Sequence, residues 1–302
     1  MSSLVSVIMP AYNCEKFIKQ SIDSILNQTY ANFELLISDD ASTDSTKLII
    51  DSYSDLRIKR FHNETNLGYT KASNKLFQHV TGNLITFQDA DDYSALNRLE
   101  LLTKYLDAHP DCACVGSNII KIDEFGKEIY KSNHPIHEEL IREHFRVLRI
   151  VMTGSSLMIK KDVLDRVGGY HLYFDRMGSE DVYWYSLILD NFKVGNVADA
   201  LYYYRTNSNS VTSSFNNPKS LVAHNLIVFL YNRRSLGRKD YLLSNNFKMA
   251  DACCRLFILI DSLAQNKFKG LYNYLKLTLS YPSLGMIFFK NFMYKFFKQK
   301  TQ

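Results

Sequence analysis

Residues Leu84-Ile85-Thr86-Phe87-Gln88-Asp89-Ala90-Asp91-Asp92 form a short apolar run that leads directly into three carboxylates. The length and composition of Leu84–Phe87 are typical of a buried strand. Like charges this close raise one another's pKa unless a cation lies between them. Because Mg²⁺ and Mn²⁺ prefer carboxylate oxygens and often share their coordination shell with substrate phosphates, the stretch predicts a metal site at a strand end. The alternative is an acidic turn that caps a helix beginning near Ala95.

Apolar runs and helical stretches alternate on either side of these residues. The connections between them are short, as in consecutive β-α units. This alternation predicts an α/β fold with a Rossmann-like, mostly parallel sheet flanked by helices. The expected strands are Leu4–Met9, Phe33–Ser38, Arg57–His62 and Leu84–Phe87, and the expected helices are Glu15–Gln28, residues 41–50, Thr70–Val80 and Ala95 to about His109.

Polar residues follow three of the expected strands. Pro10 is expected to end the first strand, because proline has no backbone N–H. In open α/β sheets, ligands bind outside the carboxyl ends of the strands. We therefore expect one crevice to collect Pro10–Asn13, Asp39–Asp40 and Asp89–Asp92.

The pattern after residue 110 is less regular. We expect strands at Cys112–Ile122, Ser155–Ile159 and Val194–Arg205, and a helix from Asp162 that ends at Gly168-Gly169. Glu180 and Asp181 begin a further helix. Acids at a helix N-terminus are stabilised by the helix dipole, so capping alone could explain this second acid pair.

The alternation stops near Pro218, and the remaining sequence is helical, apolar and aromatic in pattern. We therefore expect an α/β domain over residues 1–217 and a helical C-terminal region over residues 218–302.

The composition excludes several classes of protein. The 302 residues carry a net charge of only +5, with both signs mixed over most of the length, which argues against a nucleic-acid binder. The five cysteines form no C-x-x-C pair, which favours a reducing, cytoplasmic setting. We expect neither a signal peptide nor a transmembrane helix.

Several motifs in this order resemble the family-2 glycosyltransferases, which are inverting enzymes of the GT-A fold, and in particular those that build bacterial surface polysaccharides such as O-antigen and capsule. The resemblance covers about residues 4 to 213, and any single motif would be weak evidence. The matching stretches are Val5–Asn13, Ser24–Thr29, Asp39–Asp44, Asn66-Leu67-Gly68, Asp89–Asp92, Gly168-Gly169-Tyr170 and Glu180-Asp181.

The resemblance implies a nucleotide-sugar donor, most simply a UDP-sugar, and Mn²⁺ or Mg²⁺ as cofactor. Tyr12 would stack on the base, and Asp40 would accept the imide N–H of uracil. Lys71 would approach the base or the diphosphate, unless it is simply a solvated helix lysine. Asp91 and Asp89 would bind the metal. The nucleotide-sugar-binding residues implied in this way are Pro10, Ala11, Tyr12, Asn13, Asp40, Lys71, Asp89 and Ala90, in a half that spans about residues 1–110.

The resemblance assigns the acceptor to about residues 111–217. Asp181 would be the general base, which takes a proton from the acceptor hydroxyl as it attacks the anomeric carbon, and Glu180 would lie beside the reacting sugars. Many relatives carry a histidine two positions after a Tyr-Arg pair that can join the metal site. Here Tyr204-Arg205 is followed by Thr206 and Asn207, so the third protein ligand is open.

The C-terminal region has no acidic residue after Asp261, whereas lysines and aromatic residues alternate to its end. Phe288, Phe289, Phe292 and Phe296 fall on one face of an expected helix. Aromatic side chains with unopposed lysines are typical of a helix that lies on an anionic membrane surface. This pattern predicts a peripheral protein on the inner face of the cell membrane, which fits the lipid-linked glycan acceptor that the resemblance implies. The alternative is a helix packed on the α/β domain.

Two other functions are consistent with parts of the sequence. A nucleotidyltransferase would need a glycine-rich, basic loop after the first strand, and residues 11–16 lack one. A non-catalytic nucleotide-sugar-binding or scaffold protein of a membrane glycan-assembly complex would be expected to have lost its acids, yet Asp91 and Asp181 are both present.

Overall fold

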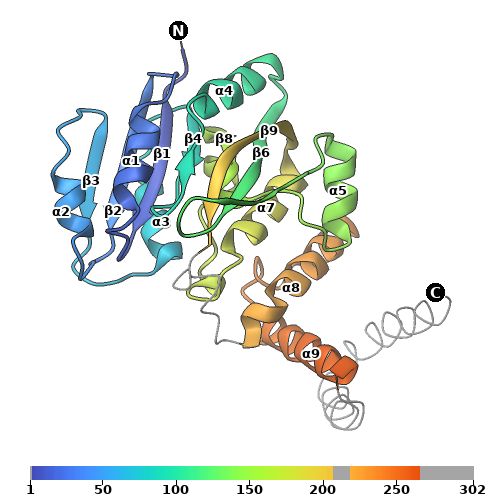
Figure 1. Ribbon diagram of the computed structural model, residues 1–302. Coiled ribbons are helices and arrows are strands. Elements are labelled where there is room, and N and C mark those ends of the chain that lie inside the picture. The colour runs from blue at the N-terminus through green and yellow to red at the C-terminus, as the bar shows by residue number, and fades with distance from the viewer. Residues whose placement is uncertain (1, 207–217, 266–302) are drawn as a thin grey trace. The chain divides into compact units, whose positions relative to one another are not determined.

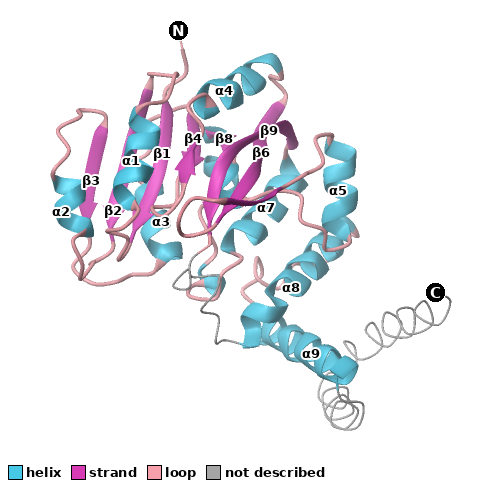
Figure 2. Cartoon of the chain, viewed as in Figure 1, coloured by secondary structure: helices cyan, strands magenta, loops and turns pink. Residues whose placement is uncertain are grey.

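The computed structural model describes residues 2–206 and 218–265 (Figure 1). The chain divides into two compact units, Met1–Ser214 and Phe215–Gln302. In the described residues, the first unit is a nine-stranded sheet with helices packed on it, and the second is helical (Figure 2).

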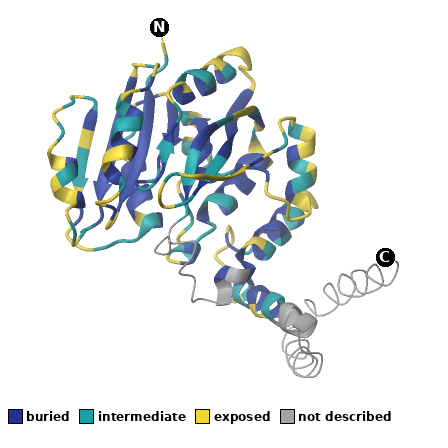
Figure 3. Cartoon of the chain, viewed as in Figure 1, coloured by how far each residue is buried: buried dark blue, intermediate teal, exposed yellow. Residues whose placement is uncertain are grey.

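Four parallel strands form the first part of the sheet, in the order β3-β2-β1-β4. Every position of β1, β2 and β4 is buried (Figure 3). Both faces are covered: Val7 lies in a core with residues of α1 and α4, whereas Phe87 packs against Phe77 of α3 and Trp184 of α7. The predicted α/β fold is confirmed. The elements are β1 (Val5–Ala11), α1 (Ile18–Leu26), β2 (Phe33–Asp39), α2 (Thr46–Asp51), β3 (Ile58–His62), α3 (Tyr69–Phe77), β4 (Leu84–Phe87) and α4 (Arg98–Ala108).

The prediction that Pro10 ends the first strand is wrong, because β1 continues through Pro10 to Ala11. The carbonyl of Ile8 accepts the N–H of Gln88 at 2.9 Å, so Ile8 faces β4. Pro10, two residues later, faces the same side. There β4 has already ended at Phe87, so no strand requires the N–H that proline lacks.

The second part of the sheet continues from β4 in the order β8-β6-β9-β5, with β7 paired to β6. Its longest pairing is the parallel one between β6 and β9, whereas β8 runs antiparallel to both β4 and β6. The elements are β5 (Tyr93–Ser94), β6 (Cys112–Ile122), β7 (Glu128–Lys131), α5 (Glu138–Arg146), β8 (Met158–Lys160), α6 (Lys161–Val167), α7 (Glu180–Asn191) and β9 (Lys193–Arg205).

The strand expected at Ser155–Ile159 begins later than predicted. Residues Gly154–Ser156 form a turn of 3₁₀ helix, η1, and only Met158–Lys160 is a strand. A second such turn, η2 (Leu172–Phe174), precedes α7. Helix α6 ends at Val167, next to the predicted Gly168-Gly169, and Gly168 has a positive φ of 78°, which favours glycine.

The described part of the second unit consists of α8 (Pro218–Ser235) and α9 (Phe247–Gln265), in agreement with the helical pattern of the sequence. Neither these helices nor any other in the described residues is long and apolar enough to cross a membrane. Asn207 and the aromatic segment at residues 285–302 lie outside the described residues.

Candidate active site

The carboxyl ends of β1, β2 and β4 meet at one edge of the sheet, which is the arrangement predicted for them. Ala11 at the end of β1 pairs with Asp39 at the end of β2, and the N–H of Asp40 donates to the carbonyl of Ala11 at 2.8 Å. On the other side of β1, Gln88 donates its N–H to Ile8. The polar residues that follow these strands are therefore neighbours.

The acid turn, Asp89–Asp92, carries strong charge repulsion. Asp89 keeps some exposure to solvent but lies deep among protein atoms, and burial together with the charge of Asp91 raises its pKa to about 6. Burial and the charges of Asp91 and Asp89 raise the pKa of Asp92 well above its usual range. A cation between these carboxylates would relieve the repulsion.

Arg205, the last residue of β9, holds the acid turn in place. Its backbone N–H donates to Oδ1 of Asp92 at 2.6 Å, and its Nε donates to the carbonyl of Asp91 at 2.8 Å. The same guanidinium group reaches Oε1 of Gln20 in α1 at 2.7 Å. These bonds tie the turn to the end of β9 and to α1.

Arg98, the first residue of α4, is fully buried behind the acid turn. Its Nη2 donates to Thr86 Oγ1 at 2.7 Å, to the carbonyl of Phe87 at 2.9 Å and to the carbonyl of Ser155 at 2.7 Å. Sequence reasoning missed this residue. The signal was its place four residues before Leu102, on the apolar face of the helix, where a charged side chain needs buried partners.

The acids fit a divalent metal ion of the predicted kind. No three side chains of His, Cys, Asp or Glu converge as a ready-made metal site among residues 2–206 and 218–265. Mg²⁺, however, is commonly held by one or two carboxylates together with substrate phosphates and water. Asp89 and Asp91 are a donor set of that size, and the charge of Asp91 contributes to the raised pKa of Asp89.

Asp40 is buried and holds the loop that leads into α3. Its Oδ1 accepts from Asn63 Nδ2 at 2.8 Å and from the N–H of Leu67 at 2.9 Å, and its Oδ2 accepts from the N–H of Gly68 at 2.8 Å. A carboxylate has about four acceptor positions. Three of them are used within the protein, so one acceptor position on Oδ2 remains for a ligand N–H.

Of the two residues that follow β1, Tyr12 has an exposed side chain, whereas Asn13 is hydrogen-bonded to a neighbouring loop. The side chain of Tyr12 is 48% exposed, as a stacking platform requires. Asn13 has a positive φ of 48°, and its Oδ1 accepts the N–H of Thr43 at 2.8 Å while its own N–H donates to Ser42 Oγ at 3.0 Å. Asn13 therefore ties the β1–α1 loop to the β2–α2 loop.

Lys71 forms an ion pair within the protein, so it is not simply a solvated helix lysine. Its Nζ forms an ion pair with Oδ2 of Asp175 at 2.5 Å, just after η2. Next to this pair, Nη2 of Arg176 donates to the carbonyl and to Oδ1 of Asn66, both at 2.9 Å. These contacts link the loop held by Asp40 to the segment that precedes α7.

The second acid pair, Glu180 and Asp181, lies at the start of α7. Glu180 is buried, and burial together with the charge of Asp181 raises its pKa to about 8. The charge of Asp181 also raises the pKa of Asp89, so the two acid pairs influence each other electrostatically. Asp181 Oδ1 accepts the N–H of Val182 at 2.8 Å, and its side chain lies against Gly154 of η1.

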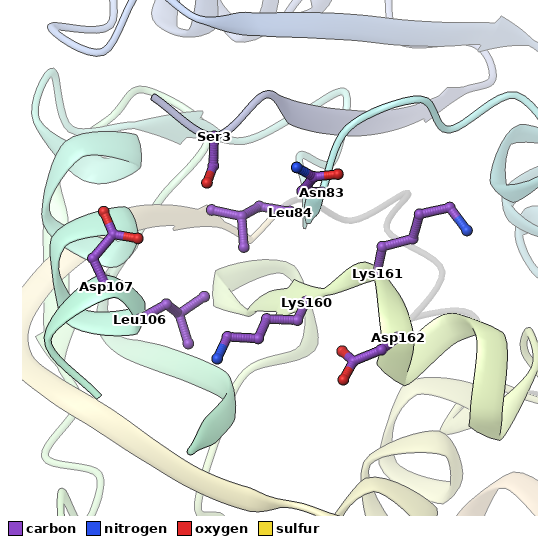
Figure 4. A pocket seen from close by; sticks show the side chains of 8 residues that line it. All are labelled: Ser3, Asn83, Leu84, Leu106, Asp107, Lys160, Lys161 and Asp162. Atoms are coloured by element: carbon purple, nitrogen blue, oxygen red, sulfur yellow. The ribbon is translucent and has the colours of Figure 1, made fainter. Parts of the chain in front are cut away.

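A pocket of about 320 Å³ lies away from these residues, beside the start of β4 and around α4 and α6 (Figure 4). Its two lysines are engaged: Lys160 Nζ donates to the carbonyl of Pro110 at 2.6 Å, and Lys161 Nζ pairs with Asp165 at 2.6 Å. None of the acids described above lines this pocket.

This sheet and its flanking helices have the GT-A fold. The chain belongs to glycosyl transferase family 2, whose family model matches residues 6–173, and it is therefore a glycosyltransferase.

Two bacterial relatives show the extent of the similarity. The putative glycosyltransferase EpsE of Bacillus subtilis is 34% identical over 211 residues, which cover 68% of this chain and 74% of that protein. The UDP-Glc:alpha-D-GlcNAc-diphosphoundecaprenol beta-1,3-glucosyltransferase WfgD of Escherichia coli is 32% identical over 213 residues, which cover 70% of this chain and 80% of that protein.

Among solved structures, S. aureus TarS 1-349 in complex with UDP-GlcNAc has the same fold. Its TM-score is 0.63 at 22% sequence identity, and the match covers 76% of this chain and 66% of TarS 1-349.

Proposed function

We propose that this glycosyltransferase moves a sugar from a nucleotide sugar, a UDP-sugar, to a lipid-linked glycan acceptor, with inversion at the anomeric carbon and with Mn²⁺ or Mg²⁺ as cofactor. The observation that carries the proposal is the electrostatic coupling of the two acid pairs. The charge of Asp181 raises the pKa of Asp89, and the charge of Asp89 raises the pKa of Glu180. The proposed metal-binding pair and the proposed base-bearing pair would therefore belong to one site.

The donor would bind at the ends of β1, β2 and β4, within residues 1–110. Tyr12 would stack on uracil, and the remaining acceptor position of Asp40 would take its imide N–H. Pro10, Ala11 and Ala90 would line this region. Support for UDP comes from TarS, which binds UDP-GlcNAc, and from WfgD, whose donor is UDP-Glc.

Asp89 and Asp91 would hold the metal ion beside the donor diphosphate. When bound, such an ion neutralises the charge that develops on the departing diphosphate. Lys71 would add a second cation if it exchanged its pairing with Asp175 for the diphosphate. Arg205 keeps the turn in place for either contact.

The acceptor would bind within residues 111–217. Asp181 would take the proton from the acceptor hydroxyl as that oxygen attacks the anomeric carbon, and the diphosphate leaves from the opposite face. This single displacement inverts the anomeric centre, so an α-linked donor gives a β-linked product. Glu180, which retains its proton to about pH 8, can donate a hydrogen bond to a sugar oxygen.

The biological role we propose is the assembly of a bacterial surface polysaccharide such as O-antigen or capsule. WfgD acts on a diphosphoundecaprenol-linked sugar, and another relative, TuaG of Bacillus subtilis, is assigned to teichuronic acid biosynthesis. For a lipid-linked acceptor we propose a cytoplasmic protein on the inner face of the cell membrane, held there by the basic and aromatic segment within residues 218–302.

The test is a screen of UDP-sugars with a short-chain α-N-acetylglucosaminyl diphospholipid, with and without Mn²⁺. We expect UDP release and a β-linked product from one donor, and neither in excess EDTA. Tight UDP-sugar binding without any turnover would instead favour the non-catalytic alternative. Equal turnover in EDTA would exclude the metal.

A further inference from the structure

Gly154 of η1 lies in direct contact with the Asp181 side chain. A Cβ atom at position 154 would be 2.2 Å from Oδ2, 2.8 Å from Cβ and 2.9 Å from Cγ of Asp181. Real Cβ atoms do not approach other atoms this closely. The carboxylate and the carbon that bears it therefore occupy the volume that any other residue at position 154 would fill.

The backbone does not explain this glycine. Glycines are commonly required where φ is positive. Gly154 is not among the positive-φ residues of the chain, and η1 has ordinary helical geometry. An alanine could adopt the same backbone, so only the absence of a side chain makes glycine necessary here.

The next residue of the same turn contacts the other acid pair. The Ser155 side chain interacts with the carboxyl group of Asp89 and lowers its pKa, which opposes the effect of burial. The Ser155 carbonyl accepts from Arg98 Nη2 at 2.7 Å, so the turn is anchored from α4. Adjacent residues of one short turn therefore touch Asp181 and Asp89.

We propose that η1 is a positioning element, which fixes the side chain of the proposed base, Asp181, relative to the proposed metal ligand Asp89. Gly154 contributes by leaving room for the Asp181 carboxylate. This inference rests on the proposed function of those two acids. Gly154 touches no reacting atom in this proposal and acts only through Asp181. A group displaced by about 1 Å can lose about 10²-fold in rate, so a single methyl group at position 154 is a sensitive probe.

Gly154→Ala is the test variant, and Gly195→Ala is the matched control. A Cβ at Gly195 would meet the hydroxyl oxygen of Tyr105 at 2.1 Å, a contact as close as that at Gly154 but with a side chain of α4 that belongs to neither acid pair, and the φ of Gly195 is not positive. With UDP-glucose and the short-chain diphospholipid above, we expect Gly154→Ala to lower kcat about 10²-fold without changing UDP affinity. Gly195→Ala should leave kcat unchanged.

A double-mutant cycle separates positioning from a general structural effect. In an Asp181→Asn background, Gly154→Ala should cause no further loss of kcat, because the base through which it acts is already gone. An equal further loss would overturn the proposal. If wild type transferred no sugar from any UDP-sugar, the proposed function would fail by itself, and crystal structures of wild type and Gly154→Ala would decide the positioning claim: a displaced Asp181 carboxylate supports it, and an unmoved one overturns it.

Discussion

Nη2 of Arg98 donates to the carbonyl of Ser155 at 2.7 Å, so a buried cation ties the start of α4 to the turn that carries Gly154. Burial lowers the pKa of Arg98 to about 10, whereas Tyr202, Asp89 and Asp92 favour its charged form. Arg98 is thus a buried countercharge to the acid turn. Its position couples the stability of the first unit to the geometry of the site.

We therefore predict that Arg98→Met lowers the stability of the first unit by about 3–5 kcal/mol, because it leaves buried acids and carbonyls without their partner. Urea unfolding followed by fluorescence is the measurement, since Trp184, the single tryptophan, lies in α7 of that unit. The control is Lys104→Met, which breaks a solvent-exposed pair with Glu100 on the same helix and should leave the stability nearly unchanged. Equal losses in the two variants would contradict the role of Arg98.

The sequence was informative wherever structure depends on neighbours in the chain. Leu84–Phe87 begins and ends where predicted, because it is an apolar run bounded by turn-forming or polar residues, and Cys112–Ile122 also has its predicted bounds. The three strand ends could be placed together because parallel topology brings them to one edge. Pro10 was misjudged because its effect depends on where β4 ends, which lies more than seventy residues away in the sequence.

The contacts that shape the site could not be read from the sequence in the same way. Arg98 donates to the carbonyl of Ser155, which is 57 residues away in the sequence. Arg205 donates to Asp92, which is 113 residues away. The closeness of Gly154 to Asp181 depends on how η1 packs on α7. Such pairings follow from tertiary packing, which no local pattern of residues encodes.

A second prediction concerns the metal. Asp91→Asn should abolish the Mn²⁺-dependent part of UDP binding and leave the fold intact, because the amide relieves repulsion but is a weaker ligand than a carboxylate. Titration calorimetry with UDP, in Mn²⁺ and in EDTA, measures this. Asp111→Asn is the control, since that acid pairs with Lys193 at the surface. If wild type bound UDP equally in both buffers, Asp91 would have no metal to hold.

A third prediction follows from Glu180, whose pKa is raised from 4.5 to about 8 by burial and by Asp181. Between these values the unfolded chain has lost the proton that the folded chain retains. The contribution of Glu180 to stability is therefore complete below about pH 4.5 and is lost as the pH rises towards 8. Glu180→Gln cannot titrate, so it should flatten this dependence and raise Tm above wild type at pH 8.

The measurement is Tm from Trp184 fluorescence at pH 5 and pH 8 in metal-free buffer. A gain of about 2–4 °C at pH 8 would correspond to about 1 kcal/mol in a unit of this size. Glu124→Gln is the control, because this acid lies in the β6–β7 connection, away from Asp181. Parallel pH profiles for wild type and Glu180→Gln would show that Glu180 ionises normally in the folded protein.

The last prediction concerns residues 285–302, which lie outside the described residues and whose role rests on sequence alone. They contain Lys290, Lys295, Lys298 and Lys300, without any acid, among five phenylalanines and one tyrosine. Each lysine near an anionic leaflet contributes about 1 kcal/mol. We therefore expect removal of residues 285–302 to release the protein from phosphatidylserine vesicles while transfer to a soluble acceptor analogue continues.

Co-sedimentation with vesicles at low and high salt is the measurement. Two further full-length variants separate the electrostatic contribution of the lysines from the apolar contribution of the phenylalanines. Replacing the four lysines by glutamine should remove the salt-sensitive part of binding, because a Debye length of about 3 Å at 1 M salt screens charge but not apolar insertion. Replacing Phe288, Phe289, Phe292 and Phe296 by serine should remove the part that survives high salt. If wild type and the truncated chain sedimented equally, membrane docking by this segment would be wrong. If the truncated chain unfolded, the segment would instead be a packed part of the protein, as the alternative interpretation of its sequence holds.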